Sequence, residues 1–185
     1  PKMTDVGQHP YIELFAYSEG EEVSGYVGNF KVKIRKKARY VDQGKCTGCG
    51  VCEEKCPWKV PSEFEMGSGK RGVIYIPFAQ AVPNVATIDK EHCAYFLKGK
   101  CRACEKFCDA GAIDFEQTDQ IVEVEVGSII LATGYDLFEP TAMPQYGYKK
   151  YDNVLTGLEF ERMTCAGGPT RGRIQLKDGR EPESV

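Results

Sequence analysis

The sequence has no excess of basic residues and no long hydrophobic run. Its 24 lysines and arginines stand against 27 acidic residues, a net charge of −3, which argues against a nucleic-acid-binding protein. No apolar stretch approaches the roughly 18 to 20 residues needed to cross a bilayer. No charged segment followed by an apolar one marks a secretory leader. We therefore expect a cytoplasmic protein with no membrane span and no nucleic-acid partner.

Cysteine, in contrast, is abundant, and eight of the nine cysteines lie in two runs. These runs are Cys46, Cys49, Cys52 and Cys56, followed by Pro57, and Cys93, Cys101, Cys104 and Cys108. The first run, CTGCGVCEEKCP, has the C-x2-C-x2-C-x3-C-P spacing by which bacterial ferredoxins bind a [4Fe–4S] cluster. Thiols clustered in this way without a secretory context favour metal over disulfides. The sequence therefore predicts an electron-transfer protein.

The second run predicts a second [4Fe–4S] cluster, although it departs from the ferredoxin spacing. Seven residues separate Cys93 from Cys101, and Asp109 stands where the first run has proline. Neither change removes a ligand. Zinc is the alternative, because two C-x2-C pairs can supply a tetrahedral site, but three thiolates within seven residues fit zinc poorly.

In two-cluster ferredoxins, which these runs resemble, the last cysteine of each run binds the other cluster. Applied here, the resemblance implies one cluster bound by Cys46, Cys49, Cys52 and Cys108. It implies a second cluster bound by Cys93, Cys101, Cys104 and Cys56. Basic residues near the runs either stabilise the reduced clusters or are ordinary surface charges; they are Lys45, Lys55, Lys59, Lys100, Arg102 and Lys106.

Three other features are interpreted as structural. His92 adjoins Cys93, but four cysteines already complete that run. Cys165 lies alone in a loop rich in glycine and proline, and a redox disulfide motif needs a second nearby cysteine. Residues 67–72 spell G-x-G-x-x-G, yet the dinucleotide fingerprint must follow a strand and open a helix, and no helical pattern follows here.

The flanking sequence has a β pattern. Residues from Tyr11 to Lys37 alternate apolar and polar side chains, with a two-residue hairpin turn expected at Gly28-Asn29. Strand 30–36 carries bases where strand 121–126 carries acids, so we expect the two strands to pair. The cysteine-rich segment between them would then be an insertion held at both ends by neighbouring strands.

The insertion contains a short internal repeat. Residues 41–46 and 88–93 both run from a β-branched residue to aspartate and then, after three residues, to cysteine. We expect a duplicated ferredoxin-like module, with short strands before and after each run, one of them at 112–115. Another strand is expected at 73–76, within the connector between the two copies.

The apolar run from Gly127 to Asp136 predicts a strand buried on both faces, ending in a tight turn at Ala132-Thr133-Gly134. With GYVGNFKVKIRKKARYVD, KCTGCGVCEEKCP, IYIPFAQAVPN, GKCRACEKFCDAGAIDF and GPTRG, the chain closely resembles the A subunit of heterodisulfide reductase. That resemblance implies a thioredoxin-reductase-like flavoprotein domain interrupted by a two-cluster ferredoxin module. It also implies that Ala132, Thr133 and Gly134 approach FAD, which would need a segment upstream of this chain.

We therefore expect an α+β protein in four parts: a β-hairpin of the flavoprotein framework at 1–38, the inserted ferredoxin module at 39–115, return strands at 116–139 and a loop-rich segment at 140–185. The predicted function is electron relay through two [4Fe–4S] clusters between FAD and partner iron–sulfur subunits, with no substrate site in this segment. The alternatives are a self-contained ferredoxin-like carrier and a zinc-stabilised interaction module.

Overall fold

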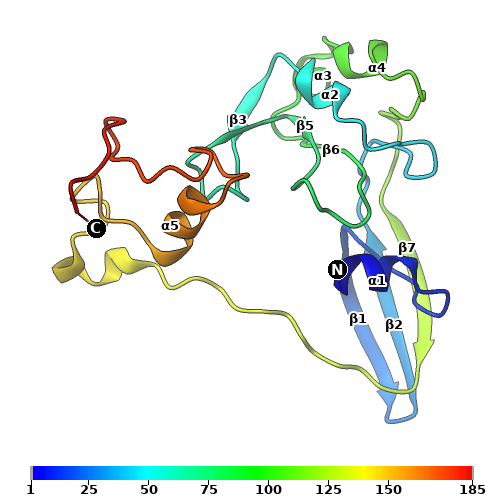
Figure 1. The fold of residues 1–185 in the computed structure, drawn as a ribbon. Coiled ribbons are helices and arrows are strands. Elements are labelled where there is room, and N and C mark those ends of the chain that lie inside the picture. Colours follow the sequence, from blue (N-terminus) through cyan, green and yellow to red (C-terminus); the bar gives the residue numbers. More distant parts are fainter. Residues whose placement is uncertain (1, 185) are drawn as a thin grey trace. The chain divides into compact units, whose positions relative to one another are not determined.

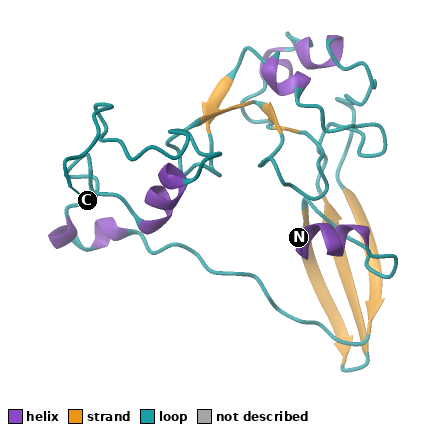
Figure 2. Ribbon diagram, in the orientation of Figure 1, coloured by secondary structure: helices purple, strands orange, loops and turns teal. Residues whose placement is uncertain are grey.

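The computed structural model describes residues 2–184, which divide into two compact units. Unit 1 comprises residues 1–59 and 72–132, and unit 2 comprises residues 60–71 and 133–185. Most elements are short and joined by loops (Figure 2). Among the described residues, no helix has the length and apolar character that a bilayer crossing requires.

A three-stranded antiparallel sheet forms one part of unit 1 (Figure 1). Its order is β1 (Ser18–Tyr26), β2 (Asn29–Lys36) and β7 (Gln120–Val126), with β2 in the centre. The pairing of β2 with β7 confirms the strand pairing expected from their opposite charges. Lys31 lies opposite Glu125 in the register, and their side chains form a 3.3 Å ion pair.

The alternating pattern also sets which face of this sheet is apolar. Val32 and Ile34 on β2 lie opposite Val124 and Val122 on β7, and side chains at alternate positions share a face. The chain reverses at Val27-Gly28, because Tyr26 pairs with Asn29. The turn is thus one residue earlier than predicted, and Gly28 takes the positive φ of 91° that a turn of this kind needs.

The β pattern predicted to begin at Tyr11 is wrong at its start. Residues 12–15 form no strand, and the preceding segment contains a helix, α1 (Lys2–Gln8), that the sequence did not predict. Ile12 and Leu14 are each 44% exposed. Alternation alone cannot form a strand, since a strand needs a partner for its backbone groups, and β1 pairs only from Ser18 onward.

The cysteine-rich part of unit 1 is built as two similar halves. Val41, before the first run, bridges Ile113, after the second. Ile88, before the second run, pairs with Ile74 in the connector, within the two-stranded sheet of β5 (Ile74–Tyr75) and β6 (Thr87–Ile88). This reciprocal pairing agrees with the internal repeat. The strand predicted at 73–76 is present as β5, whereas the strand predicted at 112–115 is reduced to the single bridge at Ile113.

The repeated aspartate has the same role in both halves. Asp42 accepts a 2.8 Å hydrogen bond from the Gly44 N–H through Oδ1, and its carbonyl accepts one from Cys46. Asp89 accepts a hydrogen bond from the His92 N–H through Oδ1. Aspartate favours such local turns because its side chain can bond backbone N–H groups two or three residues on. The repeat therefore fixes the turn that leads into each cysteine run.

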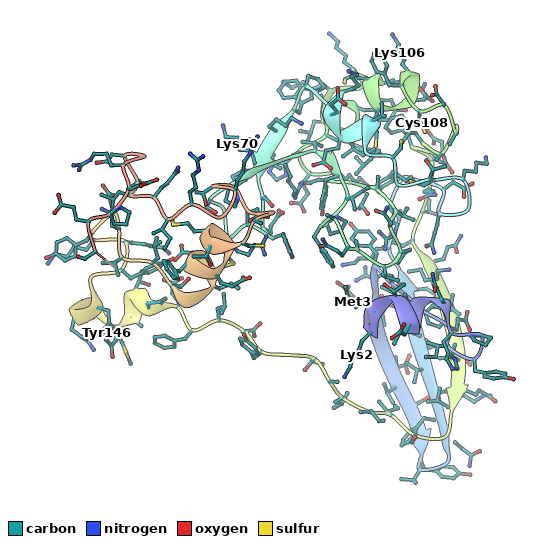
Figure 3. All side chains as sticks on the ribbon, viewed as in Figure 1. Lys2, Met3, Lys70, Lys106, Cys108 and Tyr146 are labelled. Atoms are coloured by element: carbon teal, nitrogen blue, oxygen red, sulfur yellow. The ribbon has the colours of Figure 1, made fainter. Side chains whose placement is uncertain are left out.

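Three short helices carry the cysteine runs. They are α2 (Val51–Glu54), α3 (Ala94–Lys98) and α4 (Ala103–Lys106). The Glu53 side chain ties α2 to the connector by accepting hydrogen bonds from the Gly72 and Ile76 N–H groups. Figure 3 shows Lys106 on α4, with Cys108 just beyond that helix.

Unit 2 contains α5 (Gly157–Thr164) and two 3-10 turns at Pro140–Ala142 and Pro144–Tyr146. It also contains most of the two-stranded sheet of β3 (Lys59–Pro61) and β4 (Lys70–Gly72), whose residues Lys59 and Gly72 are assigned to unit 1. Thr156 and Glu159 form a reciprocal capping box that starts α5. The Arg162 guanidinium lies 4.4 Å from the Phe64 ring and makes two hydrogen bonds to Glu65. Residues 67–72 lead into β4 rather than a helix, in agreement with their interpretation as a loop.

The strand predicted within residues 127–136 is wrong. Residues 128–136 have no regular structure, and Ile130 and Leu131 are 89% and 84% exposed. A strand buried on both faces requires paired neighbours and covering layers, and among residues 2–184 no strand pairs with this segment. Ala132, Thr133 and Gly134 are exposed as well. Only the positive φ of Gly134, 75°, agrees with the expected turn.

Candidate iron–sulfur centre

Six of the eight cysteines of the two runs belong to the core of unit 1 or pack against it. Val41, Ile74, Ile88 and Phe115 are buried there together with Cys52. Five further cysteines pack against this cluster and are only partly exposed; they are Cys46, Cys56, Cys93, Cys104 and Cys108. Cys49 and Cys101 are the exposed members. All nine cysteines of the chain are free thiols.

The burial of the cysteines follows the same order in both runs. The second cysteine of each run, Cys49 or Cys101, is exposed, whereas the third, Cys52 or Cys104, lies deeper. The spacing between the first two cysteines differs between the runs, so spacing does not set this gradient. The paired strands around Val41 and Ile88 position both runs in an equivalent way.

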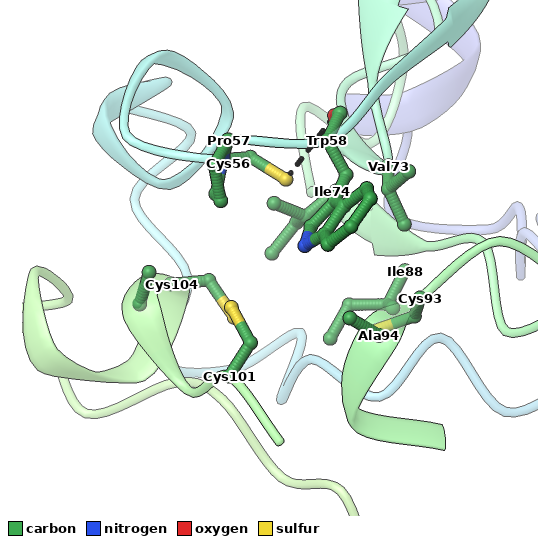
Figure 4. A pocket seen from close by; sticks show the side chains of 11 residues that line it. Cys56, Pro57, Trp58, Val73, Ile74, Ile88, Cys93, Ala94, Cys101 and Cys104 are labelled. Atoms are coloured by element: carbon green, nitrogen blue, oxygen red, sulfur yellow. Dashed lines mark hydrogen bonds between the residues drawn. The ribbon is translucent and has the colours of Figure 1, made fainter. Parts of the chain in front are cut away.

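A hollow lies between the two runs and is lined by cysteines of both. Its cysteines are Cys56, Cys93, Cys101 and Cys104, and the space measures about 330 Å³, part of it open to solvent. These are the four residues predicted to bind the second cluster. Figure 4 shows Cys56 and Trp58 on one side of the hollow, with Cys101 and Cys104 opposite them. The Cys56 thiol donates a 3.4 Å hydrogen bond to the Trp58 carbonyl.

The remaining walls of the hollow are apolar. They come from Pro57, Val73, Ile74, Ile88, Ala94 and Ala103. Soft thiolate donors in apolar surroundings suit an iron–sulfur cluster, whose potential depends on burial and on the hydrogen bonds to sulfur. The residues present therefore fit a thiolate-ligated cluster.

The other predicted ligand set includes Cys52, the buried cysteine of the first run. The pKa of the Cys52 thiol is raised to about 11, chiefly by burial and to a smaller extent by the Cys46, Cys49 and Cys108 thiols. Cys108 of the second run packs against the same core cluster as Cys46 of the first run, and that cluster contains Cys52. The Cys108 sulfur also accepts a 3.3 Å hydrogen bond from the Ala112 N–H.

Cys104 has the corresponding position in the second set. Burial raises the pKa of its thiol to about 12, with smaller contributions from Cys93, Cys52 and Cys56. Cys104 also packs against the core cluster that contains Cys52. Such thiols are protonated at neutral pH, and binding a metal centre displaces their protons. Within residues 2–184, no three His, Cys, Asp or Glu side chains are arranged around a single metal-ion position.

The remaining sequence candidates lie apart from this arrangement. The His92 ring forms a 2.9 Å contact with the Asp89 carboxylate and does not line the hollow. Cys165 follows α5 in unit 2 and is partly exposed. Trp58 also lines the hollow, which the sequence analysis did not predict. Its position two residues after Cys56 could have indicated that it lies close to the ligands.

Comparison with protein families first defines the class of protein. Residues 39–62 match the family described as "4Fe-4S binding domain". Together with the paired strands and the clustered thiols, this match makes the cysteine-rich part a ferredoxin-like iron–sulfur module. The prediction of an iron–sulfur protein is confirmed.

Comparison with individual proteins gives the particular family. The chain is 52% identical over its whole length to the A subunit of the H(2):CoB-CoM heterodisulfide,ferredoxin reductase of Methanothermobacter thermautotrophicus. It is 55% identical to the second iron–sulfur A subunit of the CoB–CoM heterodisulfide reductase of Methanopyrus kandleri, and 42% identical to the A subunit of the ferredoxin:CoB-CoM heterodisulfide reductase of Methanosarcina mazei. It spans only 28%, 28% and 23% of these proteins. The chain belongs to the family of heterodisulfide reductase A subunits, as its motifs predicted.

Proposed function

We propose that this chain relays electrons through two [4Fe–4S] clusters with crossed ligands. Cys46, Cys49, Cys52 and Cys108 bind one cluster, and Cys93, Cys101, Cys104 and Cys56 bind the other. The observation that carries the proposal is the hollow lined by Cys56, Cys93, Cys101 and Cys104. Cys56 belongs to the first run, so its presence there supports an exchange of the fourth ligand. When bound, each cluster accepts and donates one electron.

The protein's own contribution is to bind the clusters and control their surroundings. Cys52 and Cys104 hold each cluster on its buried side, while Cys49 and Cys101 hold it at the exposed edge. The Ala112 N–H lies within hydrogen-bonding distance of the Cys108 sulfur, and such a bond stabilises negative charge on a thiolate. Each cluster would therefore have one side open to electron exchange and the other excluded from water.

The wider context is proposed from the family. In the longer protein, we propose a thioredoxin-reductase-like flavoprotein domain that holds FAD near Ala132, Thr133 and Gly134, with other iron–sulfur subunits as partners. By itself the chain would bind no substrate and would hold FAD weakly or not at all, because the FAD-binding domain would belong to the longer protein. A reducing compartment such as the cytoplasm suits nine free cysteines.

Iron and sulfide analysis of anaerobically purified protein tests this proposal. Two cubane clusters require about eight iron and eight acid-labile sulfide per chain, with an EPR signal after reduction. The same sample should show no flavin absorption bands. Stoichiometric zinc without sulfide would contradict the proposal and favour a zinc-stabilised interaction module. Tightly bound flavin would contradict the statement that FAD needs the longer protein.

A further inference from the structure

The segment from Leu97 to Arg102 has features that cluster binding does not explain. It comprises the last two residues of α3 and the connection to α4, and we call it the basic loop. The first run needs only two residues between Cys46 and Cys49, whereas seven separate Cys93 from Cys101. The additional residues form α3 and this loop. An extension beyond what the ligands require calls for another role.

Aromatic contacts anchor α3, from which the basic loop extends, to the core. The Tyr95 ring lies 4.1 Å from the Phe115 ring, and the Phe96 ring lies 4.5 Å from the Tyr40 ring. At the end of α3, Gly99 takes a positive φ of 65° and donates a 2.8 Å hydrogen bond to the Tyr95 carbonyl. These contacts fix the start of the basic loop, and pre-organisation of a binding segment lowers the entropy cost of association.

The lysines of the basic loop differ from those of the first run in their ion pairing. Lys98 and Lys100 are exposed and, among the residues that the structure describes, form no ion pair. In the first run, by contrast, Lys45 lies 3.6 Å from Asp42, and Lys55 lies 2.7 Å from Glu54. Available charge of one sign steers a partner of the opposite sign during association.

The loop also presents an apolar side chain beside an exposed cysteine. Leu97 is 61% exposed, and Cys101 is the exposed cysteine of its run. An apolar contact surrounded by charges is the usual composition of a protein–protein interface. A lipid surface or nucleic acid would favour more basic residues than one pair of lysines.

We propose that the basic loop is the docking site for an acidic electron-carrier protein. Its carboxylates would contact Lys98 and Lys100, its apolar surface would contact Leu97, and its redox centre would face Cys101. One electron passes between the two centres, so that one is oxidised as the other is reduced, and no bond or proton changes. This inference rests on the proposed function, since it assigns Cys101 to a cluster.

Binding to an acidic bacterial two-cluster ferredoxin tests the docking site. The variant Lys98→Glu with Lys100→Glu is compared with a matched control, Lys2→Glu with Lys36→Glu, which reverses two exposed lysines on α1 and β2. Calorimetry is run on cluster-loaded protein at about 50 mM and about 300 mM salt, where screening differs. We expect the loop variant to bind about tenfold more weakly at low salt and the control to change less than about twofold.

A further variant, Leu97→Asn, should weaken binding at both salt concentrations, because it removes an apolar contact that salt does not screen. Equal affinities of the loop variant and the control would overturn the proposal. So would wild-type protein that binds phosphatidylserine vesicles but not the ferredoxin. Iron and sulfide are measured on every sample, so that loss of the clusters, which would contradict the proposed function, is distinguished from loss of docking.

Discussion

The two cysteine runs occupy equivalent places in the fold but are built differently. The first is compact, with Gly48 and Gly50 in left-handed conformations and α2 starting directly after them. The second contains an additional helix, α3, and brings a non-glycine residue, Cys101, to a φ of 83°. Nevertheless, the third cysteine is the deeper one in both runs. The two runs therefore share an exposed second cysteine and a less exposed third one, although their loops differ.

The largest expected difference between cysteines within each run is in their rates of alkylation in the folded apoprotein. The thiolate is the reactive species, and each pKa unit lowers its fraction about tenfold. With pKa values of about 11 and about 12, Cys52 and Cys104 should react roughly 10²- and 10³-fold more slowly than ordinary cysteines near pH 8. Their rates should rise with pH until the thiols ionise. Exposed Cys49 and Cys101 should react first in each run.

Pulse labelling with iodoacetamide, followed by peptide mass spectrometry, measures these rates. Labelling in urea serves as the control, because all four thiols should then react alike. If Cys104 were alkylated as fast as Cys101 in the folded protein, the equivalence of the two halves would be wrong.

Glycine substitutions probe the difference between the two loops. A Cβ on Gly48 would lie against the Asn84 side chain and carbonyl, and Gly48 has a φ of 68°. Gly99 has a similar φ of 65° but faces open space. We expect Gly99→Ala to cost about 1 to 2 kcal/mol through backbone strain, and Gly48→Ala to cost about 1 to 3 kcal/mol more through crowding. Thermal unfolding of loaded protein measures both, and equal losses would contradict the compact packing of the first loop.

Features with strong local or paired signals could be predicted from the sequence. The spacing of Cys46 to Cys56 indicated a cluster-binding loop, and that family is found at residues 39–62. Opposite charges at Lys31 and Glu125 indicated the pairing of β2 with β7. The repeated aspartates, Asp42 and Asp89, indicated a duplicated module.

Other features depended on contacts that the sequence does not display. The apolar residues 129–131 suggested a buried strand, but burial requires partners that these residues lack within the described chain. The alternation of apolar and polar residues around Ile12 and Leu14 also suggested a strand, but β1 pairs only from Ser18 onward. α3 was not predicted, because the spacing of Cys93 and Cys101 revealed an extension but not its conformation.

The exchange of the fourth ligand between the two runs is the central claim, and paired cysteine substitutions test it most directly. Cys108→Ala should damage the cluster that Cys46, Cys49 and Cys52 bind, and adding Cys49→Ala should damage no further cluster. Adding Cys101→Ala to Cys108→Ala should instead damage the second cluster too. The measurement is the number of intact [4Fe–4S] clusters per chain by EPR and iron content. Our account predicts one intact cluster in Cys108→Ala with Cys49→Ala and none in Cys108→Ala with Cys101→Ala; the reverse result would show that each run binds its own cluster.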